Sequence, residues 1–372
     1  MGTKETEGAY DRYSHRFGAS PPLSLGVEEE LLLVDDDLAL ATASEAVLER
    51  VPPALAGRVS SEVFTEQIEV KTGVCHGPGQ VLEELGAARR GVDEVGFPLL
   101  AAGLHPAAPA GKAKLVKKPR YEVVRKDFGD LLANPPCGLH VHVGMPDPDT
   151  AVRLANAFRL YLPVLQVLSA NSPFREGADS GHASARTSVV RAYPRFQVPR
   201  LFRDYDDFCR VADQLIAAAG VSDYTYIWWD VRPHPKLGTV EVRALDVLTD
   251  VAASSAIAGL IQAIAAKELE DPTPLVLYRE ALEESYFQAA SHGLDAEIVL
   301  DNESPAPARE VARRVLDSTR PYARDLGGED CFDELERILR EGNGADEQRR
   351  VRRERGMEAL LRHLAERTLP ER

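Results

Sequence analysis

The chain has 372 residues, of which 44% are hydrophobic and 28% are charged, and this balance excludes the disordered, collagen-like and disulfide-stabilised classes of protein. Its net charge of −15, from 59 acidic and 44 basic residues, argues against a nucleic-acid partner. No apolar run approaches the roughly 20 residues that cross a bilayer, so we expect no membrane partner. The first 20 residues are polar and the 4 cysteines have no CxxC spacing. We therefore expect a cytoplasmic protein with reduced thiols.

Taken in chain order, the predicted elements describe one α+β domain. Residues 1–22 lack periodicity and end in Pro21-Pro22, so we expect a disordered lead-in before a single domain at 23–372. Alternating apolar segments predict strands at 24–34, 66–74, 97–103, 137–144, 224–232 and 238–246. Helical periodicity separates them at about 43–51, 78–94, 149–170 and 205–219. From about residue 250 only helices are expected, at 251–270, 273–290, 305–318, 329–342 and 344–367.

Five of the predicted strands carry unusual polar residues on one face. Because side chains alternate along a strand, residues two apart share a face. In 26–34 the alternation places Glu28 and Glu30 together and Glu29 on the apolar side, as either a misjudged register or a buried partner. The polar positions of the other strands are Gln67, Glu69 and Lys71, preceded by Glu62; His140 and His142; Asp230 and Arg232; and Thr239, Glu241 and Arg243.

The composition of these faces distinguishes a cavity from a solvated surface. Each strand alone fits a half-buried strand whose polar side meets water. Exposed sheet faces, however, favour Thr, Lys and Ser, whereas these gather Glu, His, Arg and Gln, with glycines that allow close approach. Carboxylates held together repel one another unless a cation joins them. We therefore expect a lined cavity that binds both cations and anions.

The types of ligand suggest which ions these are. Carboxylates at Glu28, Glu30, Glu62, Glu69 and Glu241 favour Mg²⁺ or Mn²⁺, with one histidine tolerated. Arginines are suited to hold phosphate or carboxylate oxygens, and the candidates are Arg186, Arg232 and Arg243. Neither a P-loop nor a G-x-G-x-x-G motif occurs, so any nucleotide would be held by metal and arginine.

A competing interpretation makes His140 and His142 a zinc pair completed by a glutamate, as in a metal-dependent hydrolase. It needs a further ligand, and His105, His182 and His234 lie in no recognisable ligand spacing.

Five ordered blocks of sequence then resemble a known family. They are GVEEELLLV at 26–34, E-x₄-Q-x-E-x₂-T-x₂-C at 62–75, GLHVHVG at 138–144, LSANSPFREGADSGHASAR at 168–186 and WWDVRPHPKLGTVEVRALD at 228–246. In this order they resemble the type 2 glutamate–cysteine ligase family, the YbdK-like carboxylate–amine ligases. Five blocks in order are far more specific than any one of them.

The resemblance implies a glutamine synthetase-like fold, in which a curved, mainly antiparallel sheet binds ATP and Mg²⁺ on its concave face and carries helices on its convex face. It also implies the reaction: ATP phosphorylates the γ-carboxylate of glutamate or a related acid, and an amine then attacks the acyl phosphate to form an amide. The implied partners are small molecules, and a homodimer is the default expectation for an enzyme of this size.

By position, the resemblance also implies roles for individual residues. The metal ligands would be Glu28, Glu30, Glu62, Glu69, His140 and Glu241. Arg243 would face the transferred phosphoryl group, and Arg232 and Arg186 would bind the nucleotide phosphates or the substrate carboxylate. Gln67, His142 and Asp230 are expected to contact the substrate or support those groups.

Some alternatives stay open at this stage. A metal-dependent γ-glutamyl amide hydrolase could use the same fold, and a nucleotide sensor without turnover could keep the same pocket. The Ser- and Gly-rich block 168–186 is either a lid or a static loop beside the site. No role is assigned to Cys75 or Cys137.

Overall fold

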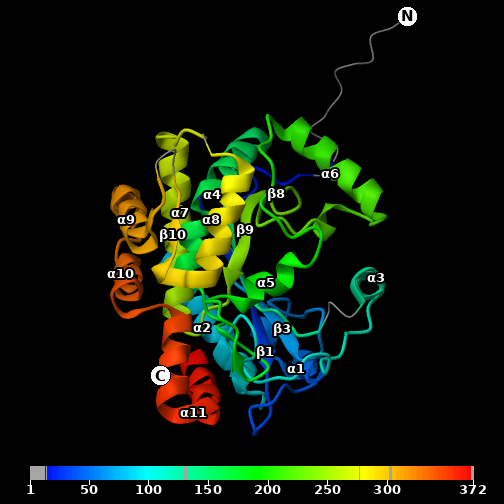
Figure 1. Cartoon of the computed structure of the whole chain (residues 1–372). Coiled ribbons are helices and arrows are strands. Elements are labelled where there is room, and N and C mark those ends of the chain that lie inside the picture. Colours follow the sequence, from blue (N-terminus) through cyan, green and yellow to red (C-terminus); the bar gives the residue numbers. More distant parts are fainter. Residues whose placement is uncertain (1–12, 14, 130–132, 276, 301–303, 370–372) are drawn as a thin grey trace, which may run out of the picture.

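A mainly antiparallel sheet forms the centre of the protein (Figure 1). The computed structural model describes Tyr13 and residues 15–129, 133–275, 277–300 and 304–369. The sheet has 7 strands in the order β2-β3-β1-β5-β9-β8, with β4 paired to the far end of β1. Their bounds are β1 Leu25–Leu33, β2 Val59–Ser61, β3 Gln67–Lys71, β4 Leu99–Leu100, β5 Gly138–Gly144, β8 Val231–His234 and β9 Thr239–Asp246. Every pairing in this sheet is antiparallel.

The strand register aligns the polar residues in rows across one face of the sheet. Glu30 of β1 lies opposite Glu69 of β3. Glu28 lies between Lys71 on one side and His140 on the other. In the next strands Glu241 lies opposite both His142 and Arg232. The polar face that the sequence alternation predicted is therefore one continuous surface.

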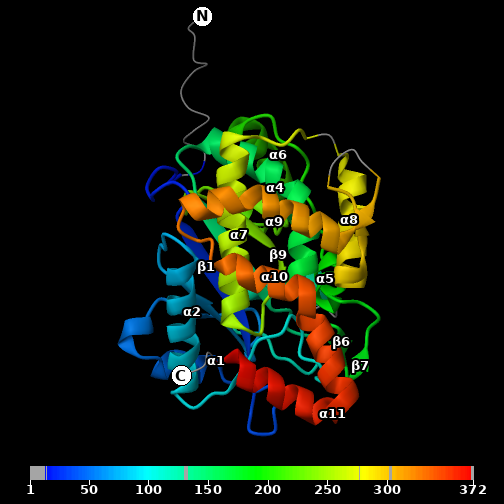
Figure 2. The ribbon, with the colours of Figure 1, turned by 90° about the vertical axis from the view of Figure 1, so that its left-hand side faces the viewer.

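Helices cover the opposite, apolar face in two layers (Figures 1 and 2). The helices against the sheet are α2 Pro78–Asp93, α4 Pro148–Ser169 and α7 Val251–Glu270. Those outside them are α8 Arg279–His292, α9 Ala308–Asp325 and α10 Cys331–Glu341, followed by α11 Gly344–Thr368. An aspartate caps the start of two of the inner helices, because Asp147 accepts from the Thr150 amide at 2.8 Å and Asp250 from the Ala252 amide at 2.9 Å. The predicted helical C-terminal region is confirmed, apart from one short hairpin between α8 and α9 that the sequence pattern did not predict.

Glu29 is explained by a buried ion pair between the sheet and its helices. Glu29 and Arg89 of α2 are both 0% exposed, and Arg89 donates from Nε and Nη2 to the two carboxylate oxygens at 2.8 and 2.7 Å. Its remaining donors reach the carbonyls of Leu248, Thr249 and Thr368. The predicted register was therefore correct, and Glu29 is a buried partner.

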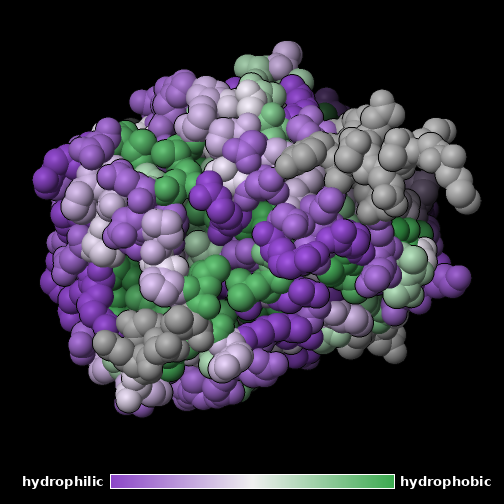
Figure 3. All heavy atoms as spheres, turned by 90° about the horizontal axis from the view of Figure 1, so that it is seen from above, coloured by the Kyte–Doolittle hydropathy of each residue, from purple (hydrophilic) through white to green (hydrophobic). Residues whose placement is uncertain are grey.

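The shorter elements lie around this core. The remaining helices are α1 Ser44–Arg50, α3 Pro119–Phe128, α5 Ala185–Arg191 and α6 Tyr205–Ala219, with 3₁₀ turns at Pro53–Leu55, Tyr224–Tyr226 and Gly293–Asp295. Two small hairpins pair β6 Phe174–Arg175 with β7 Ala178–Asp179 and β10 Glu297–Ile298 with β11 Ala306–Pro307. Where the protein is viewed from above, hydrophobic side chains show mainly between projecting hydrophilic ones (Figure 3).

Two predictions differ from the structure. The strand predicted at 224–232 is a 3₁₀ turn followed by β8, which begins only at Val231, because Asp223 caps the turn by accepting from the Thr225 amide at 2.8 Å. Residues 1–12 and 14 of the expected lead-in lie outside the described residues. The amide of Gly18, in the same segment, donates to the carbonyl of Met145 at 2.8 Å, so part of the lead-in packs against the residue that follows β5. No helix in the described part of the chain is long and apolar enough to cross a membrane.

Candidate active site

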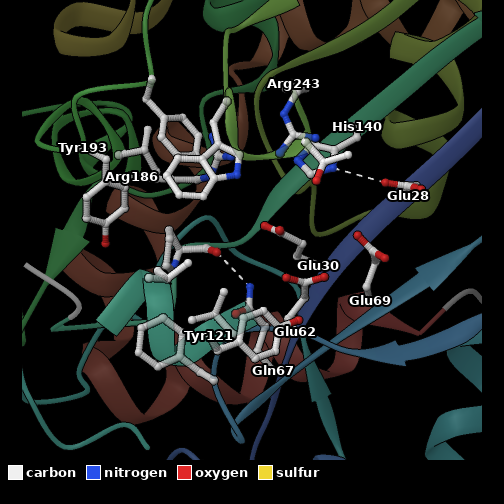
Figure 4. A pocket seen from close by; sticks show the side chains of 18 of the residues that line it. Glu28, Glu30, Glu62, Gln67, Glu69, Tyr121, His140, Arg186, Tyr193 and Arg243 are labelled. Atoms are coloured by element: carbon white, nitrogen blue, oxygen red, sulfur yellow. Dashed lines mark hydrogen bonds and ion pairs between the residues drawn. The ribbon is translucent and has the colours of Figure 1, made fainter. Parts of the chain in front are cut away.

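A cavity of about 230 Å³ lies over the polar face of the sheet. One half of its wall is acidic, with Glu28 and Glu30 from β1, Glu69 from β3 and Glu62 from the turn before β3. Figure 4 shows these carboxylates gathered together, with His140 and Arg243 above them. The sheet register brings the strand carboxylates together, because residues that lie opposite each other on paired antiparallel strands point to the same face of the sheet.

Two arginines hold Glu241 from either side. Arg232 donates from Nε to Oε2 of Glu241 at 2.7 Å, and Arg243 bonds to Oε1. Burial opposes the charge of Glu241, but both guanidiniums outweigh it and hold the pKa of this carboxyl well below its usual range. Arg232 and Arg243 both line the cavity, so each presents a positive group to a ligand within it.

Arg186 enters the cavity from α5 and depends on a glycine. A Cβ at Gly138 of β5 would overlap the guanidinium of Arg186, so a larger residue there would push this group away from its present position. Nη1 of Arg186 lies 3.8 Å from Oδ1 of Asp246, and the buried Nε of Arg186 makes no hydrogen bond among the described residues. The group is therefore held close to the sheet while keeping donor capacity for an anion.

Asp246, which sequence reasoning missed, positions this arginine by fixing the 168–186 segment. Its carboxylate accepts from the Asn171 amide at 2.9 Å, from Ser172 Oγ at 2.7 Å and from Ser184 Oγ at 2.8 Å. All of these groups are buried. The contacts favour a static loop over a lid.

Three groups of side chains could each hold a metal ion, with ligand atoms within 4.8 Å of one another. They are Glu28–Glu69–His140, Glu28–His142–Glu241 and Glu30–Glu62–Glu69. The ligands are carboxylates with at most one imidazole, which suits Mg²⁺ or Mn²⁺. Among the described residues no such group contains both His140 and His142, so the geometry does not favour the zinc pair.

The electrostatics show which carboxylates lack a counter-charge. Burial, together with Glu69 and Glu30, raises the pKa of Glu62 well above its usual range. Burial and Glu28 raise the pKa of Glu69 to about 7 despite the neighbouring Lys71. Burial also opposes the charge of Glu28, but His140 and His142 outweigh it and hold the pKa of Glu28 well below its usual range. A divalent cation at Glu62 and Glu69 would remove this penalty.

The other predicted contact residues occupy different positions. Gln67 lines the cavity, and its Nε2 donates to the Pro136 carbonyl at 2.8 Å and to Cys137 Sγ at 3.4 Å. Asp230 does not line the cavity, because it is buried in an ion pair of 2.8 Å with Arg191. His142 also lies behind the lining, beside Thr239, and its buried Nε2 makes no hydrogen bond among the described residues.

The second half of the cavity wall is aromatic and was not predicted. Its rings belong to Tyr121, Phe128, Tyr193, Phe196 and Trp228. The ring centroids of Phe128 and Tyr193 are 4.9 Å apart, and the ring of Phe196 stacks on Trp228 with centroids 5.3 Å apart. Helix α3 carries two of these rings, and a signal for it exists, since Pro119 precedes apolar residues at 121, 124 and 128 with helical spacing.

Comparison with known proteins shows the family to which the chain belongs. Residues 24–366 match the family described as glutamate-cysteine ligase family 2 (GCS2). The chain belongs to this family. A Rubrobacter xylanophilus protein with the provisional name glutamate–cysteine ligase 2-3 is 40% identical over 367 residues, covering 95% of this chain and 99% of its own. A glutamate–cysteine ligase of Haloquadratum walsbyi is 34% identical, covering 92% and 95%. These matches confirm the resemblance to glutamate–cysteine ligase family 2 that the sequence shows.

Two solved structures share the fold of this family member. Glutamate–cysteine ligase from Francisella tularensis in complex with AMP matches with a TM-score of 0.71 at 12% identity, covering 95% of this chain and 90% of that one. A bifunctional glutathione synthetase from Pasteurella multocida matches with a TM-score of 0.67 at 15% identity, covering 93% of this chain and 52% of that one. The predicted glutamine synthetase-like class is confirmed.

Proposed function

We propose that this protein is an ATP-dependent carboxylate–amine ligase that joins the γ-carboxylate of glutamate, or of a related acid, to an amine. The observation that carries the proposal is the juxtaposition, in one cavity, of two acidic groups suited to divalent cations with three arginines suited to phosphate or carboxylate, with a third such group, Glu28–His142–Glu241, extending directly behind the lining. Membership of a ligase family supports it. Such a set of groups suits phosphoryl transfer, where positioning and charge neutralisation supply most of the rate.

The carboxylate and imidazole donors that this chain brings together suit Mg²⁺ or Mn²⁺. The ligands would be Glu28, Glu30, Glu62, Glu69, His140 and Glu241, all of which belong to the three groups, and His142 is a further donor that the geometry adds. The raised pKa of Glu62 supports the fit, because this half-buried carboxylate has acidic neighbours and no ion-pair partner among the described residues. When bound, the cation would neutralise the ATP phosphates and draw charge from the transferred group.

The reaction proceeds in two displacements. An oxygen of the substrate carboxylate attacks the γ-phosphorus of ATP, the bond to the β-phosphate oxygen breaks, and ADP leaves. The amine nitrogen then attacks the carbonyl carbon of the acyl phosphate, phosphate leaves with the bonding pair, and the nitrogen loses a proton. The first displacement is needed because a carboxylate is a poor electrophile and has no adequate leaving group.

The arginines would stabilise the negative charge that moves during these steps. Arg243 is assigned to the transferred phosphoryl group, since it lines the cavity from β9 near the acidic wall. Arg232, tied to Glu241 and to the Ile227 carbonyl at 2.6 Å, is a fixed positive group beside it. Arg186 would hold a nucleotide phosphate or the carboxylate of the acid. Gln67 is assigned to the substrate, while Asp230 would act by holding Arg191.

ADP release tests the proposal directly. Purified protein with Mg-ATP and L-glutamate is assayed against cysteine and a panel of amines, with ATP-free and zinc-only controls. ADP that forms only when acid and amine are both present is the expected result, and the amine that supports it is the substrate. Release of amine from γ-glutamyl amides without ATP consumption would instead indicate the hydrolase, and Mg-ATP binding without turnover would indicate a nucleotide sensor.

A further inference from the structure

Lys71 places a fixed positive charge at the edge of the acidic wall. It lies opposite Glu28 in the pairing of β3 with β1, and its side chain projects from the same face as Glu69. Its Nζ lies 2.5 Å from Oε1 of Glu69 and 3.6 Å from Oε1 of Glu28. The ammonium therefore touches two ligands of the Glu28–Glu69–His140 group.

The three acidic groups differ in how much positive charge the protein itself supplies. Glu241 of the second group is paired with Arg232 and Arg243. Lys71 touches both carboxylates of the first group, but only Glu69, the shared ligand, of the third. In the third group, Glu30 accepts the amide of Gly138 at 2.6 Å, and no ion pair to Glu30 or Glu62 is found among the described residues. The third group thus has the largest uncompensated negative charge.

We propose that Lys71 is a built-in counter-ion of the Glu28–Glu69–His140 group, which holds those carboxylates together without metal and weakens the binding of a divalent cation there. The Glu30–Glu62–Glu69 group, which lacks such a contact to Glu30 and Glu62, is then the tight site. Lys71 is a positioning residue in this arrangement, and the inference rests on the metal dependence of the proposed function. Two like charges near each other in a partly buried site repel by far more than thermal energy.

Titration with Mn²⁺ tests the inference without ATP, acid or amine, using calorimetry and the electron paramagnetic resonance of free Mn²⁺. Wild-type protein is expected to show a tight class and a weaker class of sites. Lys71→Met should tighten the weaker class at least about tenfold and the tight class by less, because Lys71 contacts only Glu69 of the tight group. Lys71→Arg, which keeps the charge, should stay within about twofold of wild type. Glu62→Gln should weaken the tight class and leave the weaker one unchanged.

Lys118→Met is the matched control. The Lys118 ammonium, at the start of α3, donates to Ser61 Oγ at 2.5 Å and forms no ion pair with a carboxylate among the described residues. It should leave both Mn²⁺ classes unchanged. If Lys118→Met tightened Mn²⁺ binding as much as Lys71→Met, the overall charge of the protein would explain the effect and the inference would be overturned. Unchanged Mn²⁺ affinities in Lys71→Met would overturn it too.

Stability without metal is a second readout. In chelator, the melting temperature of Lys71→Met should be lower than that of wild type. In saturating Mn²⁺ the two melting temperatures should be equal. Lys71→Gln replaces Lys71→Met in this comparison if the methionine variant is insoluble. A melting temperature unaffected by the loss of Lys71 in chelator would also overturn the inference. Because these measurements use no substrate, two-class Mn²⁺ binding with no ligase turnover would overturn the proposed function alone.

Discussion

Arg89→Met is expected to destabilise the protein strongly, because it leaves a charge unpaired in the core. Arg89 makes two bonds to Glu29 and three to the carbonyls of Leu248, Thr249 and Thr368, with both charged side chains 0% exposed. Breaking a buried pair by removing one partner costs about 3–5 kcal/mol. The loss also frees the end of α11, since Thr368 is one of those partners.

Chemical denaturation followed by circular dichroism measures this change. Arg362→Ala is the control, because its pair with Glu358 is i,i+4 and mostly exposed, so its loss should cost at most about 0.5 kcal/mol. Arg89→Lys, which keeps the charge but not the planar fork, should lie between the two. A free energy of unfolding for Arg89→Met within about 1 kcal/mol of wild type would refute the assignment of a paired buried charge.

Three further changes test the site. Arg243→Ala should lower kcat about 10²- to 10³-fold and change the Kd for Mg-ATP little, which steady-state kinetics and calorimetry separate; unchanged kcat would remove Arg243 from the phosphoryl site. Glu241→Ala should abolish ADP production, and should lower the free energy of unfolding by about 3 kcal/mol because two buried guanidiniums lose their partner; normal turnover would refute its role. Asp246→Asn should raise the KM of an anionic substrate through Arg186 and cost about 2 kcal/mol in unfolding experiments; wild-type kinetics would show that the loop does not position that arginine.

The strands could be predicted from the sequence because the alternating pattern of a strand is local. Alternation along each strand requires no knowledge of the neighbours, so the residues alone place Glu28 and Glu30, Glu69, and His140 on the polar side of their own strands. Where local interactions competed with the pattern the prediction was wrong, as at 224–232, where capping by Asp223 makes a 3₁₀ turn. The apolar side of Glu29 was also predictable by parity, while its partner was not.

The amino-acid sequence by itself determined the α+β class, the polar face and the family, because each rests on residue types and spacings along the chain. Only the tertiary structure decided which strands are neighbours, and hence that Glu28 is shared by two metal-binding groups and that Lys71 lies against Glu69. The aromatic wall, the Asp246 anchor and the Arg89 pair likewise join residues far apart in the chain. Contacts of that kind depend on strand order and helix packing, which no local pattern encodes.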